Sequence, residues 1–248
     1  MSRKIWIMTL FPEYFHALKS AGVVARSFEG ESRIELNLVQ IREFSKNNYK
    51  GVDDAPYGGG PGMVMRADVL ADAFWQGIVG PGGYGKTLSE VKKRLTVIFP
   101  TPIGKVWSAP MAEEWAEQLS TSEKDLVFLC GRYEGVDQRF IDRYVDVEVS
   151  LGDYILSGGE IAVVTMLDSM LRFRVLGNQR SLGEESFSNT LDGGLEGPQY
   201  TRPRVFEDMQ VPDVLVSGHQ KKIKEFQQKQ GRILTANRRP DLRNKNVS

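Results

Sequence analysis

Residues 95–130 read LTVIFPTPIGKVWSAPMAEEWAEQLSTSEKDLVFLC, and this stretch decides the fold. It opens and closes on short runs rich in β-branched and aromatic residues, Leu95–Phe99 and Leu126–Cys130, which are typical of buried strands. Between them, Ser108–Leu119 carries apolar residues at helical spacing. Strands that alternate with helices in this way predict an α/β fold with a mostly parallel sheet.

The alternation continues on both sides of this stretch. Ile5–Phe11 and Ile34–Val39 are further candidate strands, and Glu160–Phe173 is a strongly apolar candidate helix. Residues 177–203 are rich in glycine, serine, asparagine and acids, which indicates a long loop. The glycine-rich residues 77–85 predict a surface loop.

The composition predicts three parts. Residues 1–175 form an α/β domain, residues 176–200 a linker, and residues 201–248 a small basic helical domain with a solvent-facing helix at Gln220–Gln230.

The whole chain of 248 residues balances 32 basic against 32 acidic side chains, which taken alone argues against a nucleic-acid binder. The balance is a cancellation, because the chain from Lys221 onward carries +7 and the preceding chain −7. The nine basic residues of this tail are Lys221, Lys222, Lys224, Lys229, Arg232, Arg238, Arg239, Arg243 and Lys245, against Glu225 and Asp241.

The residue inventory excludes several classes of protein. One cysteine, Cys130, cannot form an internal disulfide, and two histidines with one thiol make a poor zinc site. The first apolar run is broken at Thr9, Pro12 and Glu13, and no apolar run approaches membrane-spanning length. We therefore expect a cytoplasmic protein without a metal site.

Three segments are unusually dense in glycine: Tyr57–Met63 (YGGGPGM), Gly131–Gly135 (GRYEG) and Leu151–Glu160 (LGDYILSGGE). Glycine permits positive φ and lets the backbone approach a ligand closely. The second segment follows a predicted strand and the third leads into a predicted helix, and in an open α/β sheet such loops meet in the ligand crevice. Each segment taken singly is equally compatible with a tight turn.

Gly80–Thr87 (GPGGYGKT) formally matches the phosphate-binding P-loop. A P-loop must emerge from a buried strand, whereas Phe74–Val79 before it continues a helical pattern. We therefore interpret the match as chance.

Four segments together point to a family: DDAPYGGGPGM (53–63), LCGRYEGVD (129–137), SLGDYILSGGE (150–160) and PQYTRP (198–203). In this order they resemble the signature segments of bacterial tRNA (guanine-37-N1)-methyltransferases, and so do TLFPEYF, VPDVLVSGH and RRPDL, so that the resemblance runs from about residue 5 to 242. It implies an S-adenosylmethionine-dependent enzyme of the SPOUT class with a deep C-terminal trefoil knot, acting on tRNA as a homodimer with shared active sites. Topology rules alone argue against a knot.

The resemblance also implies cofactor contacts in the glycine segments and in the short loop after Phe99. The cofactor-binding residues implied are Thr101, Pro102, Gly131, Tyr133, Gly135, Leu151, Gly152, Asp153, Tyr154, Ile155, Leu156, Gly158 and Gly159. Close backbone approach and an apolar slot for adenine suit these residue types. Glu134 and Asp153 could equally cap the loops that carry them.

The chemistry requires a base and a cation. Guanine N1 is a poor nucleophile until its proton is removed, and negative charge then develops on O6. The resemblance implies Arg172 as the cation and Glu185 as the base. Glu185 stands where the family carries aspartate, Glu196 replaces another family aspartate, and the loop of residues 189–194 is longer than usual, so Asp192 is a competing base. Without the resemblance, Arg172 could pair with an acid at the helix end.

The basic tail fits an RNA substrate, because lysine and arginine supply phosphate contacts. The expected tRNA-binding residues are Tyr200, Arg202, Lys221, Lys222, Arg238 and Arg239, with Thr201 and Lys224 as further candidates. Mg²⁺ dependence is associated with the family, but no ligand cluster in the sequence declares a site. Two other functions stay open: a knotted methyltransferase with another RNA target or atom, and a non-catalytic RNA-binding protein.

Overall fold

The computed structural model describes residues 3–30, 33–176 and 184–242. The chain divides into two compact units, unit 1 (Met1–Val175) and unit 2 (Leu176–Ser248), and each is described by itself. Unit 1 contains a five-stranded parallel sheet with the strand order β2-β1-β6-β5-β7, which confirms the predicted α/β fold. Its strands are β1 (Arg3–Thr9), β2 (Ile34–Gln40), β5 (Leu95–Val106), β6 (Asp125–Leu129) and β7 (Val147–Ser150).

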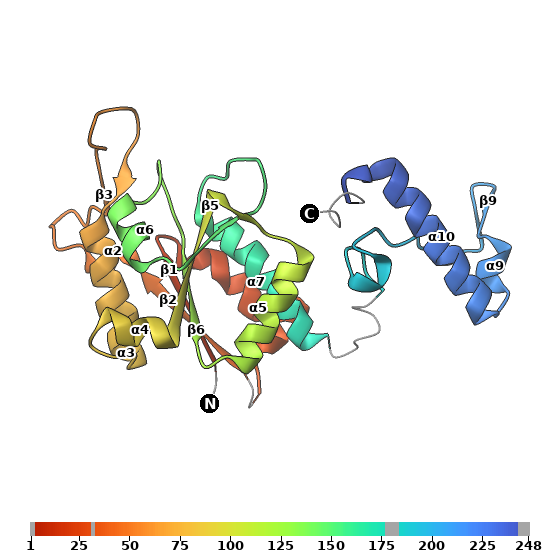
Figure 1. The fold of residues 1–248 in the computed structure, drawn as a ribbon, viewed down its shortest axis with the longest axis horizontal. Coiled ribbons are helices and arrows are strands. Elements are labelled where there is room, and N and C mark those ends of the chain that lie inside the picture. Colours follow the sequence, from red (N-terminus) through yellow and green to blue (C-terminus); the bar gives the residue numbers. More distant parts are fainter. Residues whose placement is uncertain (1–2, 31–32, 177–183, 243–248) are drawn as a thin grey trace. The chain divides into compact units, whose positions relative to one another are not determined.

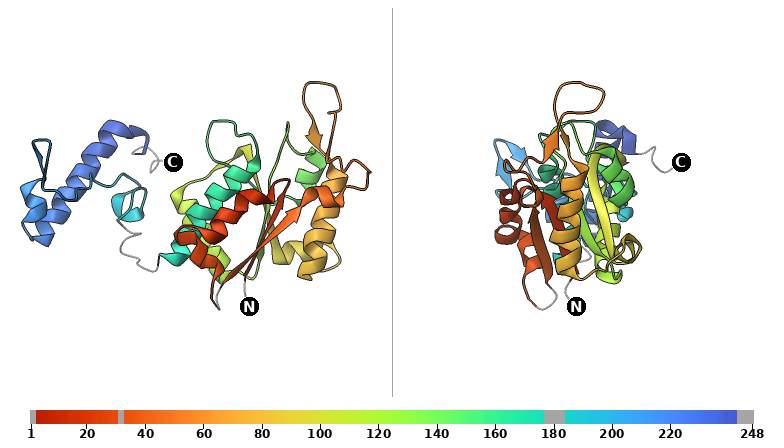
Figure 2. Two further views of the ribbon diagram at one scale, coloured as in Figure 1. Left: turned by 180° about the vertical axis from the view of Figure 1, so that it is seen from behind. Right: turned by 90° about the vertical axis from the view of Figure 1, so that its left-hand side faces the viewer.

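Helices cover both faces of this sheet, so unit 1 has three layers (Figures 1 and 2). Side chains of β1 alternate between the faces: Trp6 and Met8 enter one hydrophobic core, and Ile5 and Ile7 enter the other. The first core is closed by α2 (Ala67–Phe74), α4 (Leu88–Arg94) and α6 (Gln138–Tyr144), and the second by α1 (His16–Ser20), α5 (Ala109–Thr121) and α7 (Gly159–Val175).

The remaining elements of unit 1 are short. Two strands, β3 (Asp53–Asp54) and β4 (Val64–Met65), pair antiparallel at the base of an exposed loop that extends from the body of the unit (Figure 1). Unit 1 also contains short 3-10 helices: η1 (Pro12–Phe15), η2 (Val23–Phe28) and η3 (Ile41–Phe44).

The prediction of a surface loop at residues 77–85 is wrong. A π-helical segment, η4 (Trp75–Val79), continues α2 and is followed by α3 (Gly80–Gly82). Ile78, Val79 and Tyr84 are buried in the first core. The prediction failed because a high local density of glycine is typical of loops, and it outweighed the apolar residues between the glycines.

Unit 2 is built around one long helix, α10 (Gln220–Arg238), which confirms the predicted helix in the basic tail. Residues 194–197 pack along it: the Leu195 amide donates to Thr235 Oγ1 at 2.9 Å, and Thr235 Oγ1 donates to the Gly231 carbonyl at 2.8 Å. Residues 194–197 belong to the expected linker, so part of this linker is fixed to α10. Residues 177–183 of the linker lie outside the described residues. The other elements of unit 2 are η5 (Asn189–Leu191), the hairpin β8 (Val205–Phe206) and β9 (Met209–Gln210), and α9 (Asp213–Val216).

Across residues 3–30, 33–176 and 184–242, we find no helix with both the length and the apolar character needed to cross a membrane.

Candidate functional site

The three glycine segments meet at the carboxyl ends of the strands of unit 1. The Glu134 amide donates to the Met63 carbonyl, and the Met65 amide to the Gly135 carbonyl, both at 2.9 Å, which joins the first segment to the second. The Gly159 amide donates to the Gly131 carbonyl at 2.8 Å, which joins the second segment to the third. The expectation that these loops come together is therefore met in the structure.

Gly159 has to be glycine for this junction to form. A Cβ atom at this position would lie 2.8 Å from the Gly131 nitrogen and 2.9 Å from Cys130 Cα. Both atoms belong to the backbone at the end of β6, which cannot move aside as a flexible side chain would.

A cavity of about 430 Å³ is lined by the second and third glycine segments and by the residues after Phe99, whereas the first segment does not line it. The expected short loop after Phe99 lies within β5, at the point where the pairing with β7 is irregular between Pro100 and Lys105. This volume falls in the range of small-molecule sites. Of the residues expected to bind the cofactor, all but Asp153 line the cavity. Those that do are Thr101, Pro102, Gly131, Tyr133, Gly135, Leu151, Gly152, Tyr154, Ile155, Leu156, Gly158 and Gly159. Asp153 is exposed on the loop behind them.

The floor of the cavity holds a carboxylate that the sequence analysis missed. Phe99, Val136 and Ile141 line the floor together with Glu148 of β7. Glu148 Oε1 is buried and has no hydrogen-bond partner among the described residues. The signal in the sequence was a single acid within the otherwise apolar β-branched run Val147–Val149.

A second missed feature is an ion pair between Arg132, which lines the cavity, and the buried Glu160. Glu160, the second residue of α7, is fully buried; its Oε2 accepts from Arg132 Nε at 2.8 Å, and its Oε1 accepts from Thr9 Oγ1 at 2.8 Å. Arg132 also donates to the Ser157 carbonyl at 3.1 Å and lies over the ring of Phe11, 4.4 Å from its centroid. Arg132 therefore connects the second glycine segment to the carboxyl-terminal part of the third.

This environment affects the neighbouring thiol. Burial raises the pKa of Cys130 well above its usual value, and the negative charge of Glu160 raises it further. Cys130 is therefore an inert core residue at the end of β6.

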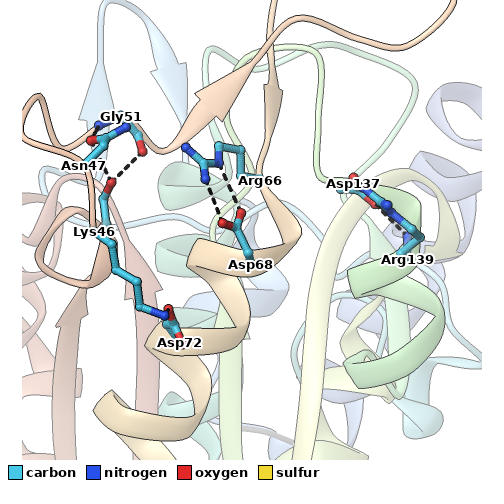
Figure 3. A network of polar contacts seen from close by, with 9 residues as sticks. Lys46, Asn47, Gly51, Arg66, Asp68, Asp72, Asp137 and Arg139 are labelled. Atoms are coloured by element: carbon cyan, nitrogen blue, oxygen red, sulfur yellow. Dashed lines mark hydrogen bonds and ion pairs between the residues drawn. The ribbon is translucent and has the colours of Figure 1, made fainter.

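Ion pairs and hydrogen bonds fix the chain on either side of the first glycine segment (Figure 3). Lys46 Nζ lies 2.6 Å from Asp72 Oδ2 on α2, and this contact raises the pKa of Lys46. At the far end, the Arg66 guanidinium contacts Asp68 through two nitrogen atoms and lowers the pKa of that carboxyl. The exposed loop between these anchors carries Tyr57, whose side chain is 97% exposed.

Arg172 lies on α7, thirteen residues beyond Gly159, and does not line the cavity. At 1.5 Å per residue, the two Cα positions are about 20 Å apart along the helix axis. The structure therefore does not bring Arg172 to the cavity of its own chain. Arg172 is half-buried and shares a helix face with exposed Ile161, Thr165 and Asp168.

The candidate bases lie in unit 2, on a compact turn. The Phe187 amide donates to the Gly194 carbonyl at 2.7 Å and closes the turn that carries Asp192, while Glu185 directly precedes this turn and its carbonyl accepts from the Ser188 amide at 3.1 Å. Glu185 is half-buried, whereas Asp192 is exposed with a left-handed backbone, φ 52°.

The residues expected to bind tRNA are also in unit 2. Tyr200 and Arg202 are exposed on the segment that leads to β8. The exposed basic residues of α10 include Lys221, Lys222 and Arg238. Arg239 follows them and is paired with Asp241 through its Nη2, 2.8 Å from Oδ2, which raises the pKa of Arg239. Arg243 and Lys245 of the tail lie outside the described residues.

The P-loop match at Gly80–Thr87 has a structural explanation. The segment follows a helix instead of a strand, and Thr87 caps α4 by accepting from the Glu90 amide. Tyr84 is buried; its hydroxyl accepts from Trp6 Nε1 at 2.9 Å and donates to Asp125 at the start of β6. The segment therefore packs at the amino end of the sheet, away from the cavity.

Within the described ranges, no three His, Cys, Asp or Glu side chains come close enough together to hold a metal ion. The described residues therefore identify no set of ligands for Mg²⁺.

Comparison with known proteins places the chain among RNA methyltransferases. The family model described as tRNA (guanine-1)-methyltransferase TrmD matches residues 3–245. A tRNA (guanine-N(1)-)-methyltransferase of Exiguobacterium sibiricum is 45% identical over 96% of this chain and 90% of its own length. Enzymes with the same name from Clostridium kluyveri and Buchnera aphidicola are each 41% identical, over 98% and 95% of this chain and 91% and 92% of their own lengths.

Proposed function

The chain belongs to the tRNA (guanine-1)-methyltransferase TrmD family, and from this premise we propose that it methylates N1 of the guanine at position 37 of tRNA. The observation that carries the proposal is one cavity lined by the second and third glycine segments, in a chain whose family match extends over both units. The first glycine segment is hydrogen-bonded to the second through Met63. The assignment of position 37 rests on the resemblance of the signature segments.

The family implies S-adenosylmethionine as the methyl donor, and the residues of the cavity fit this group. Gly158 and Gly159 line the cavity, and their lack of Cβ atoms lets the second and third glycine segments pack against each other beside it. The floor offers apolar side chains and the buried Glu148 Oε1, which has no hydrogen-bond partner within residues 3–30, 33–176 and 184–242. When bound, the cofactor supplies an electrophilic methyl group on a positively charged sulfur, and the protein has to orient it and exclude water.

We assign the proton transfer to Glu185 and the stabilisation of charge to Arg172. Glu185 takes the proton from guanine N1, because a carboxylate within hydrogen-bond distance can act as a general base. Arg172 donates to O6, where negative charge develops as the proton leaves. The sulfur departs neutral, so no general acid is needed.

We further propose that the enzyme is a homodimer in which Arg172 serves the cavity of the partner subunit. The distance of about 20 Å along α7 between Gly159 and Arg172 supports this arrangement. A half-exposed apolar surface around the cavity and on α7 supports a partner on this side of unit 1. Its residues are Phe11, Tyr14, Ile103, Tyr133, Tyr154, Ile155, Leu156 and Ile161, which are 36% to 83% exposed.

The roles that we propose for the parts of the chain follow from the uneven distribution of basic and acidic residues. We propose residues 1–175 as the knotted cofactor-binding domain, residues 176–200 as the connection and residues 201–248 as the tRNA-binding domain. The trefoil knot rests on the family resemblance together with the close crossing of Gly131 and Gly159. Exposed lysines and arginines of α10 support phosphate contacts.

Methyl transfer to matched transcripts tests the function. A tRNA transcript with guanosine at position 37 should yield 1-methylguanosine by nucleoside mass spectrometry, and the same transcript with adenosine at position 37 should yield no product. Methylation that survives the adenosine substitution, or a 2′-O-methyl product, would assign another target atom. Absence of S-adenosylhomocysteine binding by calorimetry would instead indicate a non-catalytic RNA-binding protein.

A further inference from the structure

Glu148 Oε1, which finds no hydrogen-bond partner in the part of the chain that the structure describes, identifies a part of the cavity that no motif assigns. Glu148 lies on β7 with its Cα opposite Phe99 of β5. Its neighbours Val147 and Val149 pack into the second core, so the Glu148 side chain points to the opposite face, where it lines the cavity.

Apolar side chains of the first core line the cavity on the face of the sheet to which Glu148 points. Phe99, Val136 and Ile141 line the same floor, and Phe99 and Val136 are at most 8% exposed. A buried polar atom without a hydrogen bond is costly, and such atoms in native proteins are rare enough to require an explanation. A donor brought by a ligand would remove this cost at the moment of binding.

The floor suits one half of the cofactor better than the other. Its buried apolar side chains can pack against a flat, uncharged base, whereas Tyr154 and Ile155 at the rim are 56% and 83% exposed. The charged amino-acid end of S-adenosylmethionine is strongly hydrated and fits the exposed rim. The N–H and O–H donors of the adenosine half are the 6-amino group and the two ribose hydroxyls.

We infer that Glu148 is a cofactor-selecting residue, whose Oε1 accepts a hydrogen bond from a donor of the adenosine half of the bound cofactor. This inference rests on the proposed function. It explains why a carboxylate is kept in an apolar floor, where a leucine would pack without leaving a polar atom unpaired.

Calorimetry with the full-length protein tests the inference without relying on activity. The ligands are S-adenosylhomocysteine, S-inosylhomocysteine, which lacks the 6-amino group, and the 2′-deoxy and 3′-deoxy forms of S-adenosylhomocysteine. We expect wild type to prefer S-adenosylhomocysteine over at least one of these analogues by about ten- to a hundredfold, as for a hydrogen bond to a charged group. Glu148→Leu should abolish that preference, and Glu148→Gln, which keeps an acceptor oxygen, should retain part of it.

Thermal unfolding of the ligand-free variants separates binding from folding. Glu148→Leu should unfold at the wild-type temperature or above it, because it removes an unpaired buried oxygen. The control Glu117→Leu, at an exposed position of α5, should leave all four affinities unchanged.

Two results would overturn the inference: Glu148→Leu binds S-adenosylhomocysteine as wild type does, or it loses affinity equally for all four ligands. Failure of wild type to bind S-adenosylhomocysteine would overturn the proposed function as well, so the two failures are distinguishable.

Discussion

Arg132 Nε and Glu160 Oε2 lie 2.8 Å apart, and this contact ties the loop after β6 to the first turn of α7. The Glu160 side chain is completely buried and that of Arg132 is 15% exposed. Water therefore cannot compensate either charge if the other is removed. The ion pair holds two of the loops that form the cavity, so it couples the stability of unit 1 to the geometry of the cofactor site.

The first prediction is that Arg132→Met is strongly destabilising. It leaves Glu160 buried without its counter-ion, which typically costs about 3–5 kcal/mol. The loss is measured as the change in the free energy of unfolding in urea. The double variant Arg132→Met/Glu160→Leu should recover most of the stability, because no buried charge is then unpaired, while its affinity for S-adenosylhomocysteine stays low.

The matched control is Arg139→Met. Arg139 pairs with Asp137 at 2.7 Å, but its side chain is 75% exposed (Figure 3). An exposed pair contributes roughly 0–1 kcal/mol, so this variant should be close to wild type. Equal losses in Arg132→Met and Arg139→Met would contradict the role given to the buried pair.

The second prediction concerns the junction of the glycine segments. Gly159→Ala places a methyl group 2.8 Å from the Gly131 nitrogen, so the third segment must move away from the second. We expect destabilisation of about 1–3 kcal/mol from overpacking and loss of measurable S-adenosylhomocysteine binding. Gly80→Ala is the control: its Cβ would lie 3.4 Å from the Trp75 carbonyl, an ordinary contact within a helix. Unchanged cofactor affinity in Gly159→Ala would mean that the junction does not shape the site.

Local pattern was sufficient to predict most of the sheet. The apolar runs at Ile34–Val39, Leu95–Phe99 and Leu126–Cys130 each coincide with a strand, because a strand covered on both faces needs apolar residues at successive positions. The same rule missed β7, where Glu148 interrupts a run of only four residues. That interruption is the residue to which we assign a role in ligand binding.

Features that depend on contacts distant in the sequence could not be predicted from pattern. Thr9 and Glu160 are 151 positions apart and share a hydrogen bond that only the folded sheet creates. Arg172 was assigned by resemblance to the same site as the glycine loops, yet the length of α7 separates it from the cavity of its own chain. Spacing in a motif says which residues act together, but not which subunit supplies them.

The third prediction distinguishes the two candidate bases. Glu185→Gln removes the proton acceptor and should lower the single-turnover rate by roughly 10²–10⁴-fold, the range typical of general-base catalysis. Cofactor affinity should stay at the wild-type value, because Glu185 does not line the cavity of unit 1. Asp192→Asn should retain most of the rate. The reverse pattern would assign the base to Asp192.

The fourth prediction tests whether active sites are shared. Arg172→Ala keeps the cavity and lacks the cation, whereas Gly159→Ala keeps the cation and lacks a working cavity. If Arg172 serves the partner, mixing the two inactive variants under conditions of subunit exchange should restore about a quarter of the wild-type rate, from one site in each mixed dimer. No recovery, with mixed dimers verified by native mass spectrometry, would mean that each chain uses its own Arg172.

The fifth prediction concerns the basic tail. Removing the chain from Lys221 onward would delete α10, against which Leu195 packs, so substitution of charges is the sharper experiment. The triple variant Lys221→Gln/Lys222→Gln/Lys224→Gln should weaken tRNA binding and reduce the slope of log K against log salt by about 2–3, if each lysine contacts one phosphate. Its affinity for S-adenosylhomocysteine should match wild type, because these lysines belong to unit 2 and the cavity to unit 1.

A control triple variant, Lys86→Gln/Lys93→Gln/Lys124→Gln, removes the same charge near the amino ends of β5 and β6 and should keep the wild-type slope. Equal slopes in the two triple variants would show that only net charge matters and would remove α10 from the tRNA-binding surface.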